Sequence, residues 1–91
     1  MINGTVVGYM KDTTKTMRTR LQVFIRSSDS LLKSANSIDC GGFPVYTALC
    51  FDDFADKNYD TLKDKVVLDK TKIKAYGNLS KGVLWLEDIY C

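Results

Sequence analysis

Apolar and polar residues alternate with a period of two along several short stretches of the chain. In the clearest stretch, residues 17–26, Leu21, Val23 and Ile25 alternate with polar positions. Successive side chains of a β-strand point to opposite faces, so this pattern predicts a strand with one buried and one exposed face. The buried face begins with Met17 and Thr19, and the exposed face carries Arg18, Arg20, Gln22, Phe24 and Arg26.

Two further strands are predicted on either side of this one. Residues 2–10 form the first strand, with a bulge or sharp bend at Gly8, and residues 11–15 form a polar turn. Residues 43–51 are almost continuously apolar, which predicts a central strand that is buried on both faces. On the first strand the residues expected on one side are Ile2, Val6 and Met10.

The C-terminal part of the chain predicts one helix followed by two strands. The helix starts at Asp52 or Asp53, because acidic residues in the first turn suit the helix dipole. Its apolar stripe at helical spacing consists of Ala55, Tyr59, Leu62 and Val66. Residues 70–77 and 83–89 alternate again and predict two strands. Their inward residues are Ile73, Ala75, Leu84 and Leu86, and their outward residues include Lys70, Lys72, Lys74, Tyr76 and Trp85.

The remaining segments predict connections. Residues 27–42 are rich in Ser, Asp, Asn and Gly and predict a loop, and residues 78–82 predict a turn. Residues 65–69 either finish the helix or begin the fourth strand. The predicted order is therefore β-β-β-α-β-β in one domain that spans residues 1–91. All-β architecture with one helix between strands three and four indicates a five-stranded Greek-key barrel of the OB-fold type.

Composition argues against catalysis. The chain has no His and three Cys at wide spacing, so a zinc site or a nucleophile paired with His is not available within one chain. We therefore expect no enzymatic activity, no metal and no cofactor. No apolar run is long enough to span a membrane, and the first residues lack the pattern of a signal peptide. These features predict a cytoplasmic protein without membrane contact.

Charge is segregated along the chain although the formal net charge is only +2. Residues 11–26 carry five basic side chains and only one acidic side chain. Residues 52–60 carry four aspartates and only one lysine, and residues 70–74 are basic again. This distribution predicts a basic face and an acidic face on the folded protein.

The basic stretches also contain outward aromatic residues, and this combination points to single-stranded nucleic acid. A single strand offers a charged backbone and bases with exposed π faces, so its binding surface needs cations and aromatic rings together. We expect the arginines around Gln22 and the lysines around Lys72 to lie side by side on a concave surface. The candidate nucleic-acid-binding residues are Lys11, Lys15, Arg18, Arg20, Phe24, Arg26, Lys70, Lys72, Lys74, Tyr76 and Trp85.

Structural alternatives exist for several of these residues. Phe24 would be a core residue if the strand were inverted, which would bury three arginines at high cost. The three lysines would serve to protect an exposed edge strand. Tyr76 would cover the end of the barrel, and Trp85 would form a dimer contact.

Four segments along the chain form a recognisable series: Val6-Val7-Gly8-Tyr9-Met10, Leu21-Gln22-Val23, Phe51-Asp52-Asp53-Phe54-Ala55-Asp56 and Lys72-Ile73-Lys74-Ala75-Tyr76-Gly77-Asn78-Leu79. In this order they resemble segments of bacterial and phage single-stranded-DNA-binding proteins. The resemblance implies an OB fold and sequence-independent binding of single-stranded DNA. The chain departs from the family at Tyr9, where a basic residue is usual, in an insertion before Ile73, and in lacking an acidic tail beyond Cys91. A fainter resemblance is to the small DNA-coating proteins of filamentous phages.

These observations together predict a non-catalytic protein that coats single-stranded DNA in replication or recombination and is encoded by a phage or mobile element. A barrel this small has an edge strand and a limited core, so we expect a homodimer or homotetramer. The alternative is an OB-fold protein–protein interaction module, such as a primosome component or a phage inhibitor of a host enzyme. The low net charge and the acidic helix favour that alternative. RNA binding is a third interpretation, because sequence does not reveal contacts to the 2′-hydroxyl.

Overall fold

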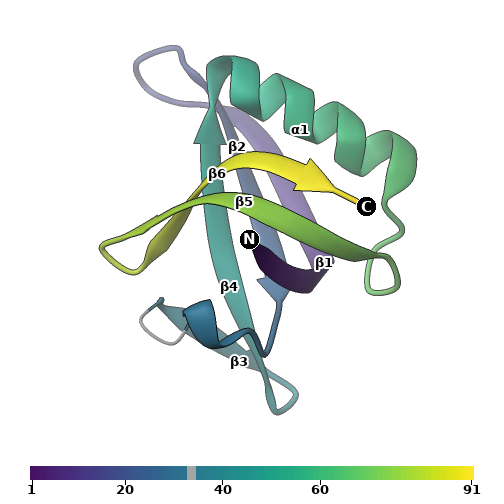
Figure 1. Cartoon of the computed structure of the whole chain (residues 1–91). Coiled ribbons are helices and arrows are strands. Elements are labelled where there is room, and N and C mark those ends of the chain that lie inside the picture. Colours follow the sequence, from purple (N-terminus) through teal and green to yellow (C-terminus); the bar gives the residue numbers. More distant parts are fainter. Residues whose placement is uncertain (33–34) are drawn as a thin grey trace.

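The computed structural model describes residues 1–32 and 35–91 and consists of a β-barrel with one α-helix (Figure 1). The elements in chain order are β1 (Ile2–Thr13), β2 (Thr19–Arg26), the 3-10 helix η1 (Ser30–Leu32), β3 (Ser37–Cys40), β4 (Phe43–Phe51), α1 (Asp52–Lys65), β5 (Lys72–Ser80) and β6 (Val83–Tyr90). Nothing is described for the side chain of Cys40.

The five long strands close into a barrel. Their order around the barrel is β2-β1-β5-β6-β4, and pairing of β2 with β4 closes the ring. All neighbouring pairs are antiparallel except β4 and β6, which run parallel. Helix α1 connects β4 to β5 and packs against β2, β4 and β6 (Figure 1). This arrangement confirms the predicted OB-like barrel and the order β-β-β-α-β-β, with β3 as an additional strand.

Alternation fills the barrel interior as the sequence predicts. Every strand of the barrel and the helix contribute apolar side chains that are almost fully buried. These residues are Ile2, Val6, Leu21, Val23, Ile25, Ala48, Cys50, Ile73, Ala75, Leu84, Leu86 and Ile89, with Ala55 and Leu62 from α1. The predicted inward positions of β2, β5 and β6 are therefore confirmed from Leu21 onward.

A bulge in β1 changes the predicted phase of this strand. The register of β1 against β2 shifts between Val6 and Gly8, which confirms the expected irregularity at Gly8. Beyond the bulge Tyr9 lies opposite Val23 and packs against the core, whereas Met10 lies opposite Gln22 and is exposed. The prediction that Met10 shares the inward side of Ile2 was wrong, because one extra residue reverses all later positions.

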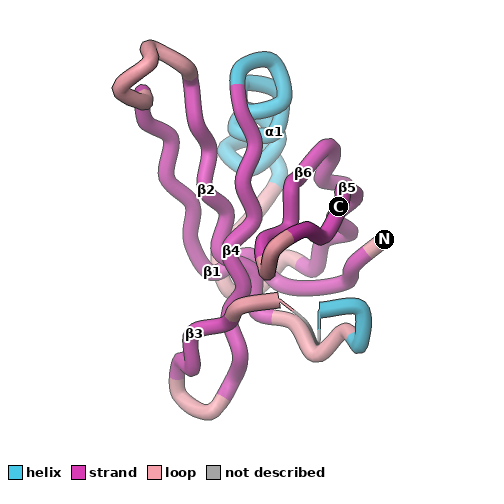
Figure 2. Tube along the Cα trace, turned by 90° about the vertical axis from the view of Figure 1, so that its left-hand side faces the viewer, coloured by secondary structure: helices cyan, strands magenta, loops and turns pink. Residues whose placement is uncertain are grey.

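The connections differ from the sequence prediction in three places. Strand β1 continues to Thr13, through the predicted turn, and Met17 lies in the following turn with a positive φ of 65° instead of inside the barrel. Residues 27–42 are not a plain loop, because they contain η1 and β3. Strand β3 pairs with the first residues of β4 through the turn at Gly41 and Gly42, and this hairpin projects from the barrel (Figure 2).

Strand β4 is not buried on both faces, contrary to the prediction. Its inward residues Ala48 and Cys50 are buried. On the outward face Val45, opposite Arg26, is also buried, but Phe43 is 59% exposed and Leu49 and Phe51 are half-buried. The continuous apolar run was misleading because no second layer covers the outer surface of a barrel. The run instead places apolar side chains on the outside of β4.

The connection after α1 resolves the ambiguous segment. The helix ends at Lys65 and β5 begins at Lys72, so residues 66–71 belong to neither element and Lys70 lies outside the strand. The backbone N–H of Asp69 donates to the carbonyl oxygen of Val6 at 2.7 Å, which ties this connection to the bulge of β1. In the described ranges, no helix has the length and apolar character needed to cross a membrane.

Asn58 is a buried polar residue that joins α1 to β6. Its Nδ2 donates to the carbonyl oxygen of Glu87 at 3.0 Å, and its Oδ1 accepts from the backbone N–H of Ile89 at 3.1 Å. Strand β4 pairs with β6 only near Leu49, so the amide of Asn58 bonds backbone groups of β6 beyond that contact. The side chain of Asn58 therefore supplies hydrogen bonds to β6 that a neighbouring strand would otherwise supply.

Replacing Asn58 with Ala should destabilise the fold by about 2 kcal/mol or more, because a buried backbone group without a partner costs about 1–3 kcal/mol. Urea unfolding followed by circular dichroism measures this change. Asp60→Ala, on an exposed position of the same helix, is the matched control and should stay within about 0.5 kcal/mol of the wild type. Equal stabilities of the two variants would contradict this role of Asn58.

Candidate nucleic-acid interface

The outer faces of β2, β4, β6 and β5 form one continuous surface. Across β2 and β4, Arg20 lies opposite Phe51, and Gln22 lies opposite Leu49. Leu49 is in turn opposite Trp85 of β6, and Trp85 is opposite Asn78 of β5. A row of side chains therefore crosses four strands, with Leu49 and Trp85 at its centre. Strands two and three of an OB fold, here β2 and β4, carry the usual ligand-binding face of that fold.

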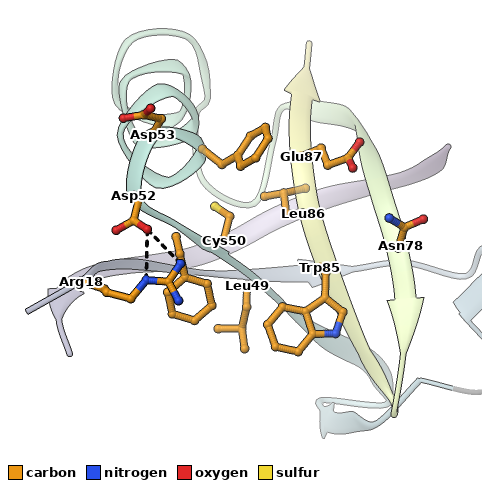
Figure 3. A pocket seen from close by; sticks show the side chains of 11 residues that line it. Arg18, Leu49, Cys50, Asp52, Asp53, Asn78, Trp85, Leu86 and Glu87 are labelled. Atoms are coloured by element: carbon orange, nitrogen blue, oxygen red, sulfur yellow. Dashed lines mark hydrogen bonds and ion pairs between the residues drawn. The ribbon is translucent and has the colours of Figure 1, made fainter. Parts of the chain in front are cut away.

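A hollow of about 430 Å³ lies at the end of this surface next to α1, and we call it the aromatic pocket (Figure 3). The rings of Phe51 and Trp85 are stacked at its base, with centroids 6.3 Å apart and an angle of 27° between their planes. The guanidinium of Arg18 lies 4.8 Å from the centroid of the Phe51 ring. The residues that line it include Arg18, Leu49, Phe51, Phe54, Asn78 and Trp85, with Asp52, Asp53 and Glu87.

Asp52 holds Arg18 in this position. Two donors of Arg18, Nε and Nη2, bond the same Oδ2 of Asp52 at 3.0 and 2.9 Å. Asp52 is the first residue of α1 and has a positive φ of 55°. Its carboxylate orients the guanidinium of Arg18 toward the ring of Phe51.

The bulge in β5 positions Trp85. The register of β5 against β6 shifts between Tyr76 and Gly77. A Cβ atom at Gly77 would lie 2.1 Å from the carbonyl oxygen of Trp85, so only glycine permits the two backbones to approach this closely. Trp85 remains 40% exposed, and its indole ring reaches the pocket from β6 (Figure 3).

The charge in the aromatic pocket suits bases better than phosphates. One cation, Arg18, is accompanied by the carboxylates of Asp52, Asp53 and Glu87. Carboxylates repel phosphate but accept hydrogen bonds from the exocyclic amino groups of bases. Burial raises the pKa of the Cys50 thiol beneath the pocket, so this sulfur is protonated at neutral pH and is a poor nucleophile.

A second hollow of about 500 Å³, which we call the basic groove, lies where β1, the end of β2 and β5 meet. Its cations are Arg26, Lys72 and Lys74, and Ser27 and Ser28 also line it. No acidic side chain is among its lining residues. Arg26 also pairs with Asp69 at 2.6 Å and lies 5.6 Å from the ring centroid of Phe43.

The arginines of β2 and the turn before it are all paired within the protein. Arg18 bonds Asp52, Arg20 bonds Asp12, and Arg26 bonds Asp69. Hydrogen bonds from Arg20 lower the pKa of the Asp12 carboxyl below its ordinary value. Lys11 is similarly paired with Asp56 of α1 at 3.0 Å. Sequence reasoning missed these partners because each lies on a different element from its arginine or lysine.

The predicted site residues divide between the two hollows and the surface around them. Arg18 and Trp85 line the aromatic pocket, and Arg26, Lys72 and Lys74 line the basic groove. The others lie elsewhere: Arg20 and Phe24 lie between the hollows on β2, Lys11 faces α1, Lys15 lies in the turn after β1, Lys70 lies in the turn before β5, and Tyr76 contacts Tyr90. The arginine row and the lysine row therefore meet only at Arg26.

Two structural alternatives from the sequence can now be decided. Phe24 faces outward opposite Thr47, and its ring would be 3.5 Å from a Cβ placed on Gly8, so it covers the backbone of β1. Lys74 does not protect an edge, because β5 pairs at this position with Asn3 of β1 and with Tyr90 of β6, whereas Lys72 pairs with Thr5 of β1 and lies beyond the end of the β6 ladder. The residues that sequence reasoning missed are Leu49, Phe51, Phe54 and Asn78. Residues 43–51 are almost continuously apolar, so polarity gave no signal that would have placed the first two on the outer face.

The fold and these two hollows define an OB-like barrel with an exposed aromatic surface and a separate basic groove. The chain matches no protein-family model, no curated protein and no solved structure in the three comparisons made. Membership of the single-stranded-DNA-binding family stays a prediction. In the described part of the chain, no cluster of side chains has the composition of a metal site.

The pairing of Arg20 with Asp12 predicts a titration that NMR can follow. In the wild type the carboxyl carbon of Asp12 should titrate below the ordinary value for Asp, and Arg20→Gln should raise that pKa toward it. Because the folded pKa is lowered, the pair stabilises the fold at pH values above the ordinary pKa of Asp. This stability is lost as the pH falls through the folded pKa. An unchanged Asp12 titration in Arg20→Gln would contradict the pairing.

Proposed function

We propose that this protein binds single-stranded DNA without catalysis, by stacking bases on Phe51 and Trp85. The observation that carries the proposal is the stacked, solvent-accessible pair of rings on the outer face of β4 and β6, with the guanidinium of Arg18 beside it. This surface coincides with the ligand-binding face of the OB fold. Coating of single strands during replication or recombination is the role that such an activity supports.

The energetics of stacking support this assignment. A base stacked on an aromatic side chain contributes about 1–3 kcal/mol, and every base has a π face, so little sequence preference is expected. Phe54 adds a further exposed ring beside the pocket. Gln22 and Asn78 flank Leu49 and Trp85 in the same row and supply amide groups that can bond base edges.

Self-association is part of the same proposal. Among residues 1–32 and 35–91, strand β3 pairs only with β4, so its other edge offers backbone groups for pairing, and Ile38 on it is 61% exposed. A second copy of the chain is an occupant that would cover such an edge. A homodimer or homotetramer would place several aromatic pockets on one DNA strand.

Removing either ring should weaken binding of oligo-dT. Phe51→Leu and Trp85→Leu keep an apolar side chain but remove the π face, so each should lose about 1–3 kcal/mol of binding free energy, which is about 5- to 150-fold in Kd. Fluorescence anisotropy of a labelled oligonucleotide measures this loss. Phe51→Tyr keeps the ring and is the matched control, so its affinity should remain close to that of the wild type.

The wild type adds a second readout, because DNA stacked on Trp85 should quench its fluorescence. The protein has one tryptophan, so the signal reports this pocket alone. Absence of quenching by oligo-dT at low salt, or equal affinity of Phe51→Leu and Phe51→Tyr, would overturn the stacking proposal.

A second candidate function is a protein–protein interaction module. It is favoured by the three carboxylates that line the aromatic pocket and by the pairing of the arginines with internal aspartates. A basic, aromatic-containing segment of another protein would complement such a pocket. The two functions differ in what releases the bound partner. A protein partner would stay bound after nuclease treatment and would not be displaced by oligo-dT. Binding of DNA would instead be weakened strongly by salt.

The ion pair at Arg18 generates a separate prediction. Asp52→Asn should tighten DNA binding about two- to fivefold, because it frees Arg18 from an exposed pair worth about 0.2–1 kcal/mol. Asparagine tolerates a positive φ, so the backbone at this position is preserved. Anisotropy titrations at low salt measure the effect.

Asp53→Asn is the matched control, because Asp53 lines the same pocket but pairs with no cation in the described part of the chain. It removes the same formal charge and should produce a smaller gain. In the background of Arg18→Gln the difference between the two variants should disappear. Equal gains in the presence of Arg18 would show that only overall charge matters.

A further inference from the structure

The aromatic pocket leaves the phosphates of a bound strand without enough cations. Its one arginine is paired with Asp52, and two more carboxylates line it. A strand whose bases stack on Phe51 and Trp85 still carries one negative charge for each nucleotide. Binding at physiological salt therefore needs cations elsewhere along the path of the backbone.

We propose that the basic groove is a second subsite, which binds the sugar–phosphate backbone of the same DNA strand. The inference rests on the proposed function, and it assigns phosphodiester groups to Arg26, Lys72 and Lys74. These cations line one hollow with the hydroxyl-bearing residues Ser27 and Ser28, and no acidic side chain is among the lining residues. Cations and hydroxyl groups supply donors to phosphate oxygens, and the Asp69 carboxylate that pairs with Arg26 is not among the lining residues of the hollow.

The two lysines are placed for this task by β5. They alternate with the buried residue Ile73, so both side chains point outward on the same face of the strand. Both are exposed, and neither forms an ion pair in the described part of the chain. Since β5 pairs with β1 at both lysines and also with β6 at Lys74, Lys74 is not needed to protect an edge. Two uncompensated cations beside a hollow are thus available for an anionic ligand.

Strand β2 connects the two subsites. Arg18 lies just before β2 at the aromatic pocket, and Arg26 is its last residue at the basic groove. At about 3.3 Å for each residue, this distance is about 26 Å. A single strand at the spacing of B-form DNA, about 3.4 Å for each nucleotide, spans it with about eight nucleotides, and an extended strand needs fewer. This length falls within the known range of site sizes for OB folds, about 4–16 nucleotides.

The salt dependence of binding tests the groove directly. The double variant Lys72→Gln with Lys74→Gln should bind an oligo-dT of about 16 nucleotides at least about tenfold more weakly at low salt. The slope of log affinity against log salt concentration should become shallower by about 1.4, since each phosphate contact on a single strand contributes about 0.7. The matched control is Lys63→Gln with Lys65→Gln, two lysines in the last turn of α1, which should leave the slope unchanged.

Oligonucleotide length separates failure of this inference from failure of the proposed function. An oligo-dT of about 4 nucleotides reaches the aromatic pocket alone, so it should quench Trp85 equally in the wild type and in the lysine variant. If the long oligonucleotide quenches Trp85 but both lysine pairs give the same salt slope, the groove is not a subsite although the protein binds DNA. If neither oligonucleotide quenches Trp85 in the wild type, both proposals fail together.

Inorganic phosphate distinguishes a polymer site from a site for the free anion. At constant ionic strength, replacing chloride with phosphate should not release the long oligonucleotide, because single contacts to separate lysines bind an isolated anion weakly. Release of DNA by phosphate under these conditions would overturn the assignment of the groove to the DNA backbone.

Discussion

Closure of the sheet into a barrel is the constraint on which the other features depend. Strand β1 achieves it by pairing with β5 from Ile2 to Thr5 and with β2 from Thr5 onward, and the bulge between Val6 and Gly8 lies within the pairing with β2. Once β2 pairs with β4, the interior is sealed and its small volume is filled by alternating apolar residues. Every functional side chain must then lie outside, on a surface that no second layer covers.

The same constraint explains why the outer surface is divided into an aromatic part and a basic part. Strand β4 has neighbours on both edges over its middle, and its outer apolar residues Leu49 and Phe51 are brought against Trp85 by the parallel β6. Strand β5 reaches β1 at the other end, where Lys72 and Lys74 meet the end of β2. The aromatic pocket and the basic groove therefore lie at opposite ends of β2 and do not form a single site.

The sequence predicted the features that depend on local alternation and failed where distant elements decide. Leu21, Val23 and Ile25 have a strict period of two, so the inward face of β2 and its outward arginines followed directly. Met10 was misplaced because the bulge reverses the phase. Gly8 marked an irregularity, but the polarity of β1 does not show that the irregularity inserts one residue. Phe51 was missed because a continuous apolar run does not reveal how many faces are covered. Asp12, Asp52 and Asp69 could not be identified as partners of arginines, because each pair joins separate elements.

The internal ion pairs do not prevent an anionic ligand from binding, because exposed pairs are weak. Arg18 and Asp52 are both more than half exposed, and such a pair contributes about 0–1 kcal/mol. A phosphate or a base that approaches Arg18 can therefore replace Asp52 as its partner at a similar energy. Before the ligand arrives, Asp52 holds the arginine in a defined rotamer. Part of the cost of ordering this side chain is then met during folding instead of binding. Asp52 therefore improves the geometry of Arg18 but opposes an anionic ligand through its charge, and the charge is the larger effect where Asp52→Asn tightens binding. That combination favours a protein that holds bases by stacking and uses few, well-placed cations for the backbone.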